Sequence, residues 1–170
     1  MDLKKFIRDI PDFPEKGIIF RDITPLLKDK NAFQYAINEM TTALKSIDFD
    51  VIAAPEARGF IFGGALAYNL GKSFVPIRKP GKLPYKTLSE KYQLEYGTAE
   101  LEIHEDAINE GEKVLIFDDV LATGGTAKTL KSLIEKTGGI VAGMAFLIEL
   151  TYLNPRKLLK DEKVISLITY

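Results

Sequence analysis

The chain has 170 residues, of which 46% are hydrophobic, and this length suits one well-buried core but not two ordinary domains. Its 23 basic and 24 acidic residues nearly cancel, which excludes a general electrostatic attraction to nucleic acid or to a membrane surface. Cysteine is absent, which excludes disulfides, thiolate catalysis and cysteine-bound metal. No apolar run approaches the roughly 18 residues of a membrane span. We therefore expect a single cytoplasmic domain over residues 1–170, with no nucleic-acid or membrane partner.

Apolar runs of strand length alternate with longer segments of helical periodicity, which predicts an α/β fold with a mostly parallel central sheet flanked by helices. Residues 31–47 place apolar side chains on one helical face, with Asn31 as the expected N-cap. Residues 49–55 are predicted as a buried strand, residues 59–72 as a helix and residues 73–79 as the next strand. Helix and strand thus already alternate in the first half of the chain.

The second half continues the alternation after one irregular segment. Residues 80–97 are charged and irregular, which predicts a long mobile loop or hairpin, and such loops in compact domains are often functional. The elements expected after this segment are strands at 98–104 and 113–119, a helix at 126–139, and strands at 140–150 and 163–170.

The most informative motif is the sequence VLIFDDVLATGGT at residues 114–126, where a predicted central strand ends and a helix begins. In open α/β sheets, ligands bind at that edge. The glycines allow successive backbone N–H groups to converge on an anion, Thr123 and Thr126 add hydroxyl donors, and the helix adds the positive end of its dipole. The turn is a candidate phosphate site, although a glycine-rich turn by itself fits a purely geometric role equally well.

Two adjacent carboxylates, Asp118 and Asp119, stand just before this turn. Ionised carboxylates only accept hydrogen bonds, so the pair suits a vicinal diol or a divalent cation and not the oxygens of a phosphate. A sugar phosphate carries its phosphate at one end and its hydroxyl groups at the other. We therefore predict that the motif binds a ribose phosphate.

This motif resembles the signature of the type I phosphoribosyltransferases, which bind 5-phosphoribosyl 1-pyrophosphate. Other stretches are similar to the adenine-specific members of that family, and together they span the chain from about residue 6 to the C-terminus. They are DFPEKGIIFRDITPLL (12–27), EARGFIFG (56–63), RKPGKLP (78–84) and LEYGTAELEIHEDAI (94–108).

The resemblance implies a reaction and an architecture. The family transfers the 5-phosphoribosyl group to N9 of adenine, giving AMP and pyrophosphate, with Mg²⁺ bound mainly through the pyrophosphate and not directly assigned to side chains. It also implies a small hood over the base site at about residues 1–30, a mobile catalytic loop at about 80–97, and a homodimer. The implied partners are therefore the small molecules adenine and 5-phosphoribosyl 1-pyrophosphate.

The resemblance also implies roles for individual residues. Those for the 5′-phosphate and ribose are Asp118, Asp119, Ala122, Thr123, Gly124, Gly125 and Thr126. Those for pyrophosphate are Glu56, Ala57, Arg58, Arg78, Lys79, Lys82 and Tyr96. Adenine would lie against Ile19, Phe20 and Arg21, with Phe20 stacking on the ring and the backbone of its neighbours binding the edge. The catalytic set is Glu95, as the proton-transfer group for N9, with Asp118, Asp119 and Arg58.

The sequence departs from the family pattern at two positions, and other interpretations of the same residues stay open. Pro80 stands where some members carry another basic residue, and Pro55 stands where a small or aliphatic residue is expected. From the residues alone, 17–23 is a buried strand and 78–82 a solvated turn. An enzyme for hypoxanthine, xanthine or orotate would share the phosphate-binding residues, and a non-catalytic sensor of the sugar pyrophosphate would keep the phosphate turn. The only histidine, His104, is predicted to be structural.

Overall fold

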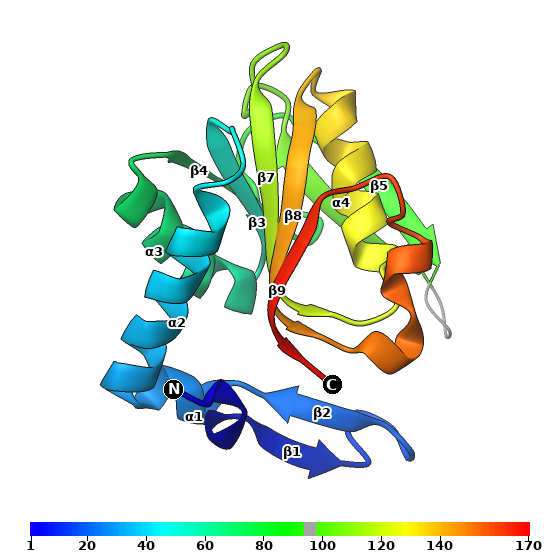
Figure 1. Ribbon diagram of the computed structural model, residues 1–170. Helices are drawn as coiled ribbons and strands as arrows, with labels where there is room; N and C mark the ends of the chain where they lie inside the picture. The colour runs from blue at the N-terminus through cyan, green and yellow to red at the C-terminus, as the bar shows by residue number, and fades with distance from the viewer. Residues whose placement is uncertain (94–97) are drawn as a thin grey trace.

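The computed structural model describes residues 1–93 and 98–170, so Glu95 and Tyr96 lie outside the described residues. A five-stranded parallel sheet with strand order β4-β3-β7-β8-β9 forms the centre (Figure 1). Its strands are β3 (Val51–Pro55), β4 (Ser73–Ile77), β7 (Lys113–Leu121), β8 (Ile140–Glu149) and β9 (Val164–Thr169). The predicted α/β fold class is confirmed.

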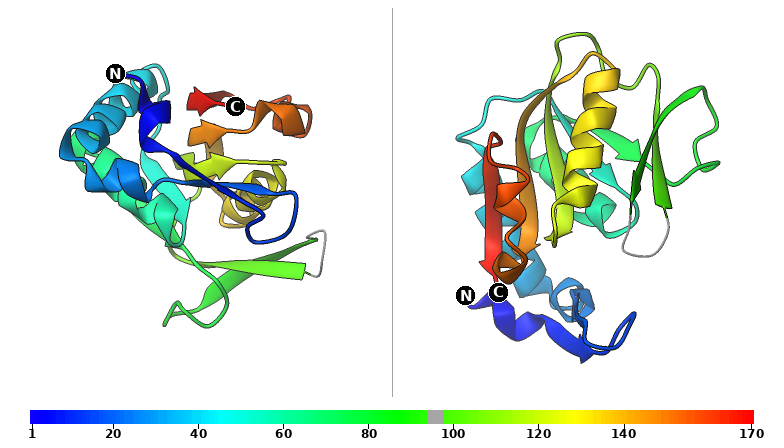
Figure 2. Two further views of the ribbon diagram at one scale, coloured as in Figure 1. Left: turned by 90° about the horizontal axis from the view of Figure 1, so that it is seen from below. Right: turned by 90° about the vertical axis from the view of Figure 1, so that its right-hand side faces the viewer.

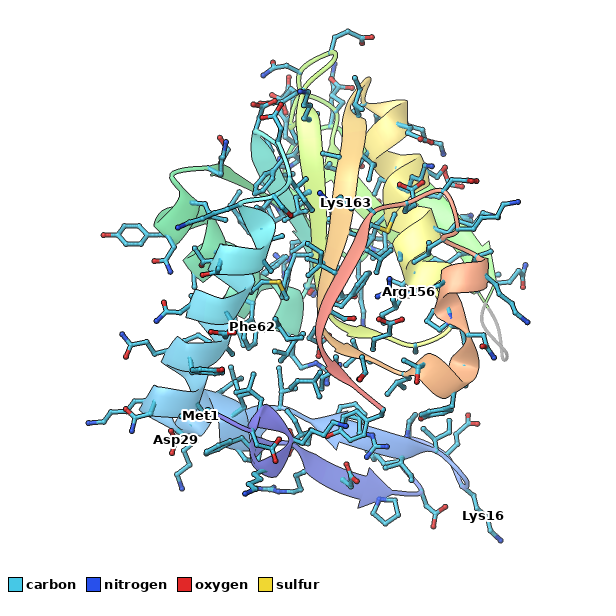
Figure 3. All side chains as sticks on the ribbon, in the orientation of Figure 1. Met1, Lys16, Asp29, Phe62, Arg156 and Lys163 are labelled. Atoms are coloured by element: carbon cyan, nitrogen blue, oxygen red, sulfur yellow. The ribbon has the colours of Figure 1, made fainter. Side chains whose placement is uncertain are left out.

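Helices cover both faces of this sheet. One core cluster packs α2 (Lys30–Leu44) and α3 (Arg58–Leu70) against one face, where Phe62 is buried (Figure 3). A second cluster packs α4 (Gly125–Lys136) against the other face. Successive strand residues point to opposite faces, so a strand buried on both sides is apolar throughout, as the VLIF run of β7 is.

The start of α2 differs from the prediction. Asp29 is the N-cap, and its side chain accepts hydrogen bonds from the backbone N–H groups of Asn31 and Ala32 at 3.0 and 2.9 Å. The expected cap at Asn31 was therefore wrong by two residues, because Asp29 already satisfies these free donors.

The N-terminal residues form a separate antiparallel hairpin below the sheet (Figures 1 and 2). It contains β1 (Arg8–Pro11) and β2 (Ile19–Asp22), flanked by a 3₁₀ turn at Leu3–Phe6 and helix α1 (Thr24–Lys28). The strand expected from the GIIFRDI run is present, but it is not buried throughout: Ile19 is 44% exposed. Arg21 stacks on the ring of Tyr170 at 3.8 Å, which ties the hairpin to the last strand.

A second hairpin, β5 (Thr87–Gln93) with β6 (Thr98–His104), stands beside α4. Glu90 on β5 accepts a hydrogen bond from Ser132 and pairs with Lys136, both on α4. In the described part of residues 80–97, the hairpin alternative is therefore the correct one. None of the helices in the part of the chain that the structure describes is long and apolar enough to cross a membrane.

The segment between β8 and β9 contains two short 3₁₀ helices, Thr151–Leu153 and Pro155–Lys157. It passes beside the N-terminal end of α4, where Pro155 and Leu158 border the space that a side chain at Gly124 would occupy. This segment therefore backs the turn that the sequence predicts to bind phosphate.

Candidate active site

Part of the predicted set lies around a cleft of about 410 Å³ at the carboxyl ends of β3, β4 and β7. The loop after β7 encloses a smaller hollow of about 50 Å³ next to it. Asp118 and Thr126 line both, so the two spaces adjoin. The cleft is lined by Pro55, Glu56, Ala57, Arg58, Lys79, Tyr92, Leu101, Asp118, Asp119 and Thr126.

The two adjacent aspartates lie at the base of the cleft in different environments. Asp118 Oδ1 accepts a hydrogen bond from the backbone N–H of Asp119 at 2.8 Å. Burial, together with the negative charge of Asp119, raises the pKa of the Asp118 carboxyl well above its ordinary value. Two carboxylates side by side are electrostatically unfavourable unless a cation or hydrogen-bond donors arrive to compensate them.

Arg58, the first residue of α3, supplies the nearest positive charge. Its Nε lies 2.6 Å from Asp119 Oδ2, yet the N–H does not point at the oxygen well enough to make a hydrogen bond. Asp119 is 5% exposed, and its Oδ2 has no hydrogen-bond donor among the described residues. A buried carboxylate oxygen of this kind is suited to a donor from a ligand, such as a sugar hydroxyl.

The turn after β7 has the geometry of an anion site. Gly124 is the N-cap of α4 in the left-handed region, with φ 93°, and it provides no side chain that could occupy the N–H groups of the first helical turn. No acidic residue stands in that first turn. The Gly125 N–H makes only a long hydrogen bond of 3.5 Å to Thr123 Oγ1. The amides of the turn and the helix dipole therefore favour a phosphate in the adjoining hollow, which Ala122, Thr123 and Thr126 also line.

The loop after β3 and the turn after β4 are joined by a carboxylate. Glu56 Oε1 accepts from the backbone N–H of Lys79 at 2.7 Å, and Glu56 Oε2 lies 3.3 Å from Arg78 Nη2. The Lys79 N–H, followed by Arg78, lowers the pKa of Glu56. A cis peptide bond joins Glu56 to Ala57, directly after Pro55. Glu56 thus orders the basic turn, while its carboxylate is already engaged.

The basic side chains of the turn at residues 78–82 differ in their position relative to the cleft. Lys79 lines the cleft, whereas Arg78 and Lys82 are not among the lining residues. Arg78 Nη1 donates to the carbonyl of Lys82 at 3.4 Å, and the N–H of Gly81 donates to Glu102 at 3.1 Å. The turn is therefore a fixed structure and not simply a solvated loop.

The predicted base-binding residues come from the N-terminal hairpin. The Arg58 guanidinium lies 4.9 Å from the centroid of the Phe20 ring, within cation–π range, and Phe13 contacts the same ring edge-on at 5.2 Å. Arg58 therefore joins Phe20 to Asp119, which brings the predicted base and ribose sites together. Ile19 and Arg21 flank Phe20 on β2.

Sequence reasoning missed Tyr92 and Leu101, which line the cleft from β5 and β6. Tyr92 belongs to none of the stretches quoted above, and Leu101 lies within the 94–108 stretch without a role of its own. The pairing of the two strands brings both to the cleft. His104 accepts a hydrogen bond from the backbone N–H of Tyr85 at 3.2 Å, in keeping with a structural role. Glu95 and Tyr96 lie outside the described residues.

A family model described as the phosphoribosyl transferase domain matches residues 22–169. The chain belongs to this family. A protein of Thermosipho melanesiensis named adenine phosphoribosyltransferase is 74% identical over 170 residues, covering 100% of this chain and 97% of that protein. The predicted family and the enzyme class are thus confirmed.

Solved structures agree with this assignment. An adenine phosphoribosyltransferase from Thermoanaerobacter pseudethanolicus superposes with a TM-score of 0.95 at 56% identity, covering 99% of this chain and 98% of that one. The enzyme from Giardia lamblia in complex with 9-deazaadenine gives a TM-score of 0.94 at 33% identity, covering 99% and 96%. The similarity therefore includes the N-terminal hairpin and the cleft, and not only the central sheet.

Proposed function

We infer that this chain transfers the 5-phosphoribosyl group from 5-phosphoribosyl 1-pyrophosphate to adenine, giving AMP and pyrophosphate. The observation that carries the inference is the cleft with its adjoining hollow, which together bring a phosphate turn, two adjacent aspartates and a cationic loop side by side. Each part matches one part of the sugar pyrophosphate. The choice of adenine is supported by relatives of that name at up to 74% identity along the whole chain.

The phosphate turn and the acidic pair would hold the ribose 5-phosphate. The amides of Ala122–Thr126 would bind the 5′-phosphate, while Asp118 and Asp119 accept hydrogen bonds from the ribose hydroxyls. The donor-less Oδ2 of Asp119 supports this role. As the bond between C1 and pyrophosphate breaks, positive charge develops on the sugar ring, and the buried carboxylates would stabilise it.

The cationic side of the cleft would bind the leaving pyrophosphate. Arg58 and Lys79 line the cleft, with Arg78 behind them, and arginine suits the oxygens of a phosphate because it donates two parallel hydrogen bonds. Lys82, Ala57 and Tyr96 complete this proposed set. We assign Glu56 a supporting role through its bond to the Lys79 amide, because a carboxylate repels an anion.

Adenine would lie beside Phe20, with the backbone of Ile19 and Arg21 at its edge. Glu95 is proposed to move the N9 proton, a task for a carboxyl group whose pKa changes as the loop closes. Residues 1–30 would act as the hood and residues 80–97 as the catalytic loop of one domain spanning residues 1–170.

Magnesium is proposed to accompany the pyrophosphate. Within residues 1–93 and 98–170, no group of three or more acidic, histidine or cysteine side chains could hold a metal ion alone. Mg²⁺ is commonly held by substrate phosphates, water and one or two carboxylates, so this cleft with its few acids fits the ion. The bound ion would offset the negative charge of the leaving group. We further propose a cytoplasmic homodimer, which light scattering on the purified protein would test.

The decisive experiment incubates the purified protein with Mg²⁺, the phosphoribosyl donor and each base in turn. Formation of AMP from adenine, with little reaction of hypoxanthine, xanthine or orotate, supports the proposal. Efficient conversion of another base would refute the adenine assignment. Tight binding of the donor without turnover of any base would favour a sensor of the sugar pyrophosphate.

A further inference from the structure

A buried carboxylate outside the cleft lies directly behind the phosphate turn. Glu149, the last residue of β8, is 2% exposed and pairs in register with Leu121, the last residue of β7. Arg156 Nε and Nη2 each lie 2.8 Å from a different oxygen of this carboxylate. Ser166 on β9 also donates to it. Both oxygens of the Glu149 carboxylate therefore accept hydrogen bonds, and Arg156 binds them in a bidentate geometry.

The turn that carries Arg156 packs against the phosphate turn. A Cβ built on Gly124 would lie 3.3 Å from the carbonyl oxygen of Pro155 and 3.5 Å from Cδ2 of Leu158. Pro155 is buried and directly precedes Arg156, which lies between its own turn and the sheet in Figure 3. A movement of residues 154–158 would therefore change the surface on which Gly124 rests.

Two ionic contacts of residues 151–163 can be compared. Arg156 binds Glu149 on the sheet and directly follows Pro155, which borders Gly124, whereas Glu162 pairs with Lys131 on α4. Lys131 lies on the second turn of that helix, away from the phosphate hollow, whose lining residues all fall within 118–127 and Phe146. The chain thus offers one contact behind the phosphate turn and a second contact of the same segment that serves as a control.

We propose that Arg156 and Glu149 are positioning residues for the ribose 5-phosphate half of the site. Their two-pronged contact holds residues 154–158 against Gly124, and this fixes the backbone amides of the phosphate turn. The identity of the bound group rests on the proposed function. A lysine would keep the charge but could not make both hydrogen bonds, so geometry and charge can be separated.

The test compares four full-length variants with the wild type: Arg156→Met, Arg156→Lys, the double variant Glu149→Gln with Arg156→Met, and Lys131→Met. The primary measurement is the Kd for ribose 5-phosphate by calorimetry, which needs no turnover, followed by KM for the donor and for adenine. Arg156→Met should raise that Kd by about tenfold or more, because small displacements of binding groups are costly. Arg156→Lys should lie between it and the wild type, and KM for adenine should change little.

The double variant separates positioning from simple stability. It leaves no buried charge unpaired, so its Tm should recover relative to Arg156→Met, while its Kd for ribose 5-phosphate stays raised. Recovery of the Kd together with the Tm would overturn the proposal. An equally large increase of this Kd in Lys131→Met would also overturn the proposal. So would an unchanged Kd in Arg156→Met, or a wild type that does not bind ribose 5-phosphate. If Arg156→Met does not fold, the double variant decides alone. A wild type that makes no AMP refutes the proposed function, while the Kd comparison still decides this inference.

Discussion

Replacing Gly124 with alanine should lower the stability of the protein and weaken its binding of the phosphoribosyl donor. Gly124 has φ 93°, and a left-handed backbone costs a residue with a Cβ about 1–2 kcal/mol. The new methyl group would lie 3.3 Å from the carbonyl oxygen of Pro155, so one of the two must also move by a few tenths of an ångström. For a chain of this length, a loss of that size should lower Tm by roughly 2–8 °C. Relief of the strain would turn the amides away from the 5′-phosphate, raising KM for the donor by about tenfold.

Gly111→Ala is the matched control for this experiment. Gly111 has φ 76°, and a Cβ built on it would meet no heavy atom within 4 Å. It precedes β7 at the opposite end of the sheet from the site, so it carries a similar backbone strain without contact with the phosphate turn. Both variants should lose similar stability by calorimetry, and only Gly124→Ala should raise KM for the donor. An equal rise in KM for both, or none for Gly124→Ala, would refute the reasoning.

Three further outcomes are expected. Asp118→Asn should raise Tm at about pH 8. Because the pKa of Asp118 is raised in the folded state, that state binds the proton more tightly than the unfolded state, and ionisation of Asp118 lowers stability as the pH rises. Thermal melts from about pH 4 to 8 should therefore show the gain in Tm disappearing near the ordinary aspartate pKa of about 3.9. Asp119→Asn should lower kcat on the order of a hundredfold, measured as AMP formation, because the buried charge near the developing cation is lost; unchanged turnover would contradict this role. Phe20→Ala should raise KM for adenine by about tenfold, given 1–3 kcal/mol per stacked base, with KM for the donor as the internal control.

The fold was largely predictable because its signals are local. The VLIF run of β7 is buried on both faces, and such a run in an alternating chain implies a central parallel strand. The N-terminal hairpin was harder to predict. Its GIIFRDI run has the composition of a core strand, yet Ile19 is 44% exposed, because the hairpin stands outside the sheet and leaves part of one face open. Apolar composition alone does not distinguish a core strand from one whose side chains are partly exposed.

The site was predictable where consecutive residues form one structure. Asp118 to Thr126 follow one another through a strand end and a turn, so their spacing in sequence fixes their spacing in space. Contacts between distant segments gave no such signal. Tyr92 reaches the cleft through strand pairing, and Arg156 meets Glu149 only because an irregular segment returns to the sheet. Such partners depend on tertiary packing, which a single sequence does not display.

The contact between Arg58 and Asp119 shows that the geometry of an ion pair matters as well as the charges of its members. The Arg58 guanidinium contacts Asp119 by charge but without a hydrogen bond, and the Arg58 side chain is 41% exposed. Only the Arg58 side of this contact is exposed, because the Asp119 side chain is 6% exposed, so the arginine can leave at small cost only if another donor or positive charge takes its place. A ribose hydroxyl could then donate to Asp119 while Arg58 turns to the pyrophosphate. If the proposed function holds, the ion pair would compensate the buried carboxylate when no substrate is bound, and the missing hydrogen bond would leave Asp119 Oδ2 open to the ribose.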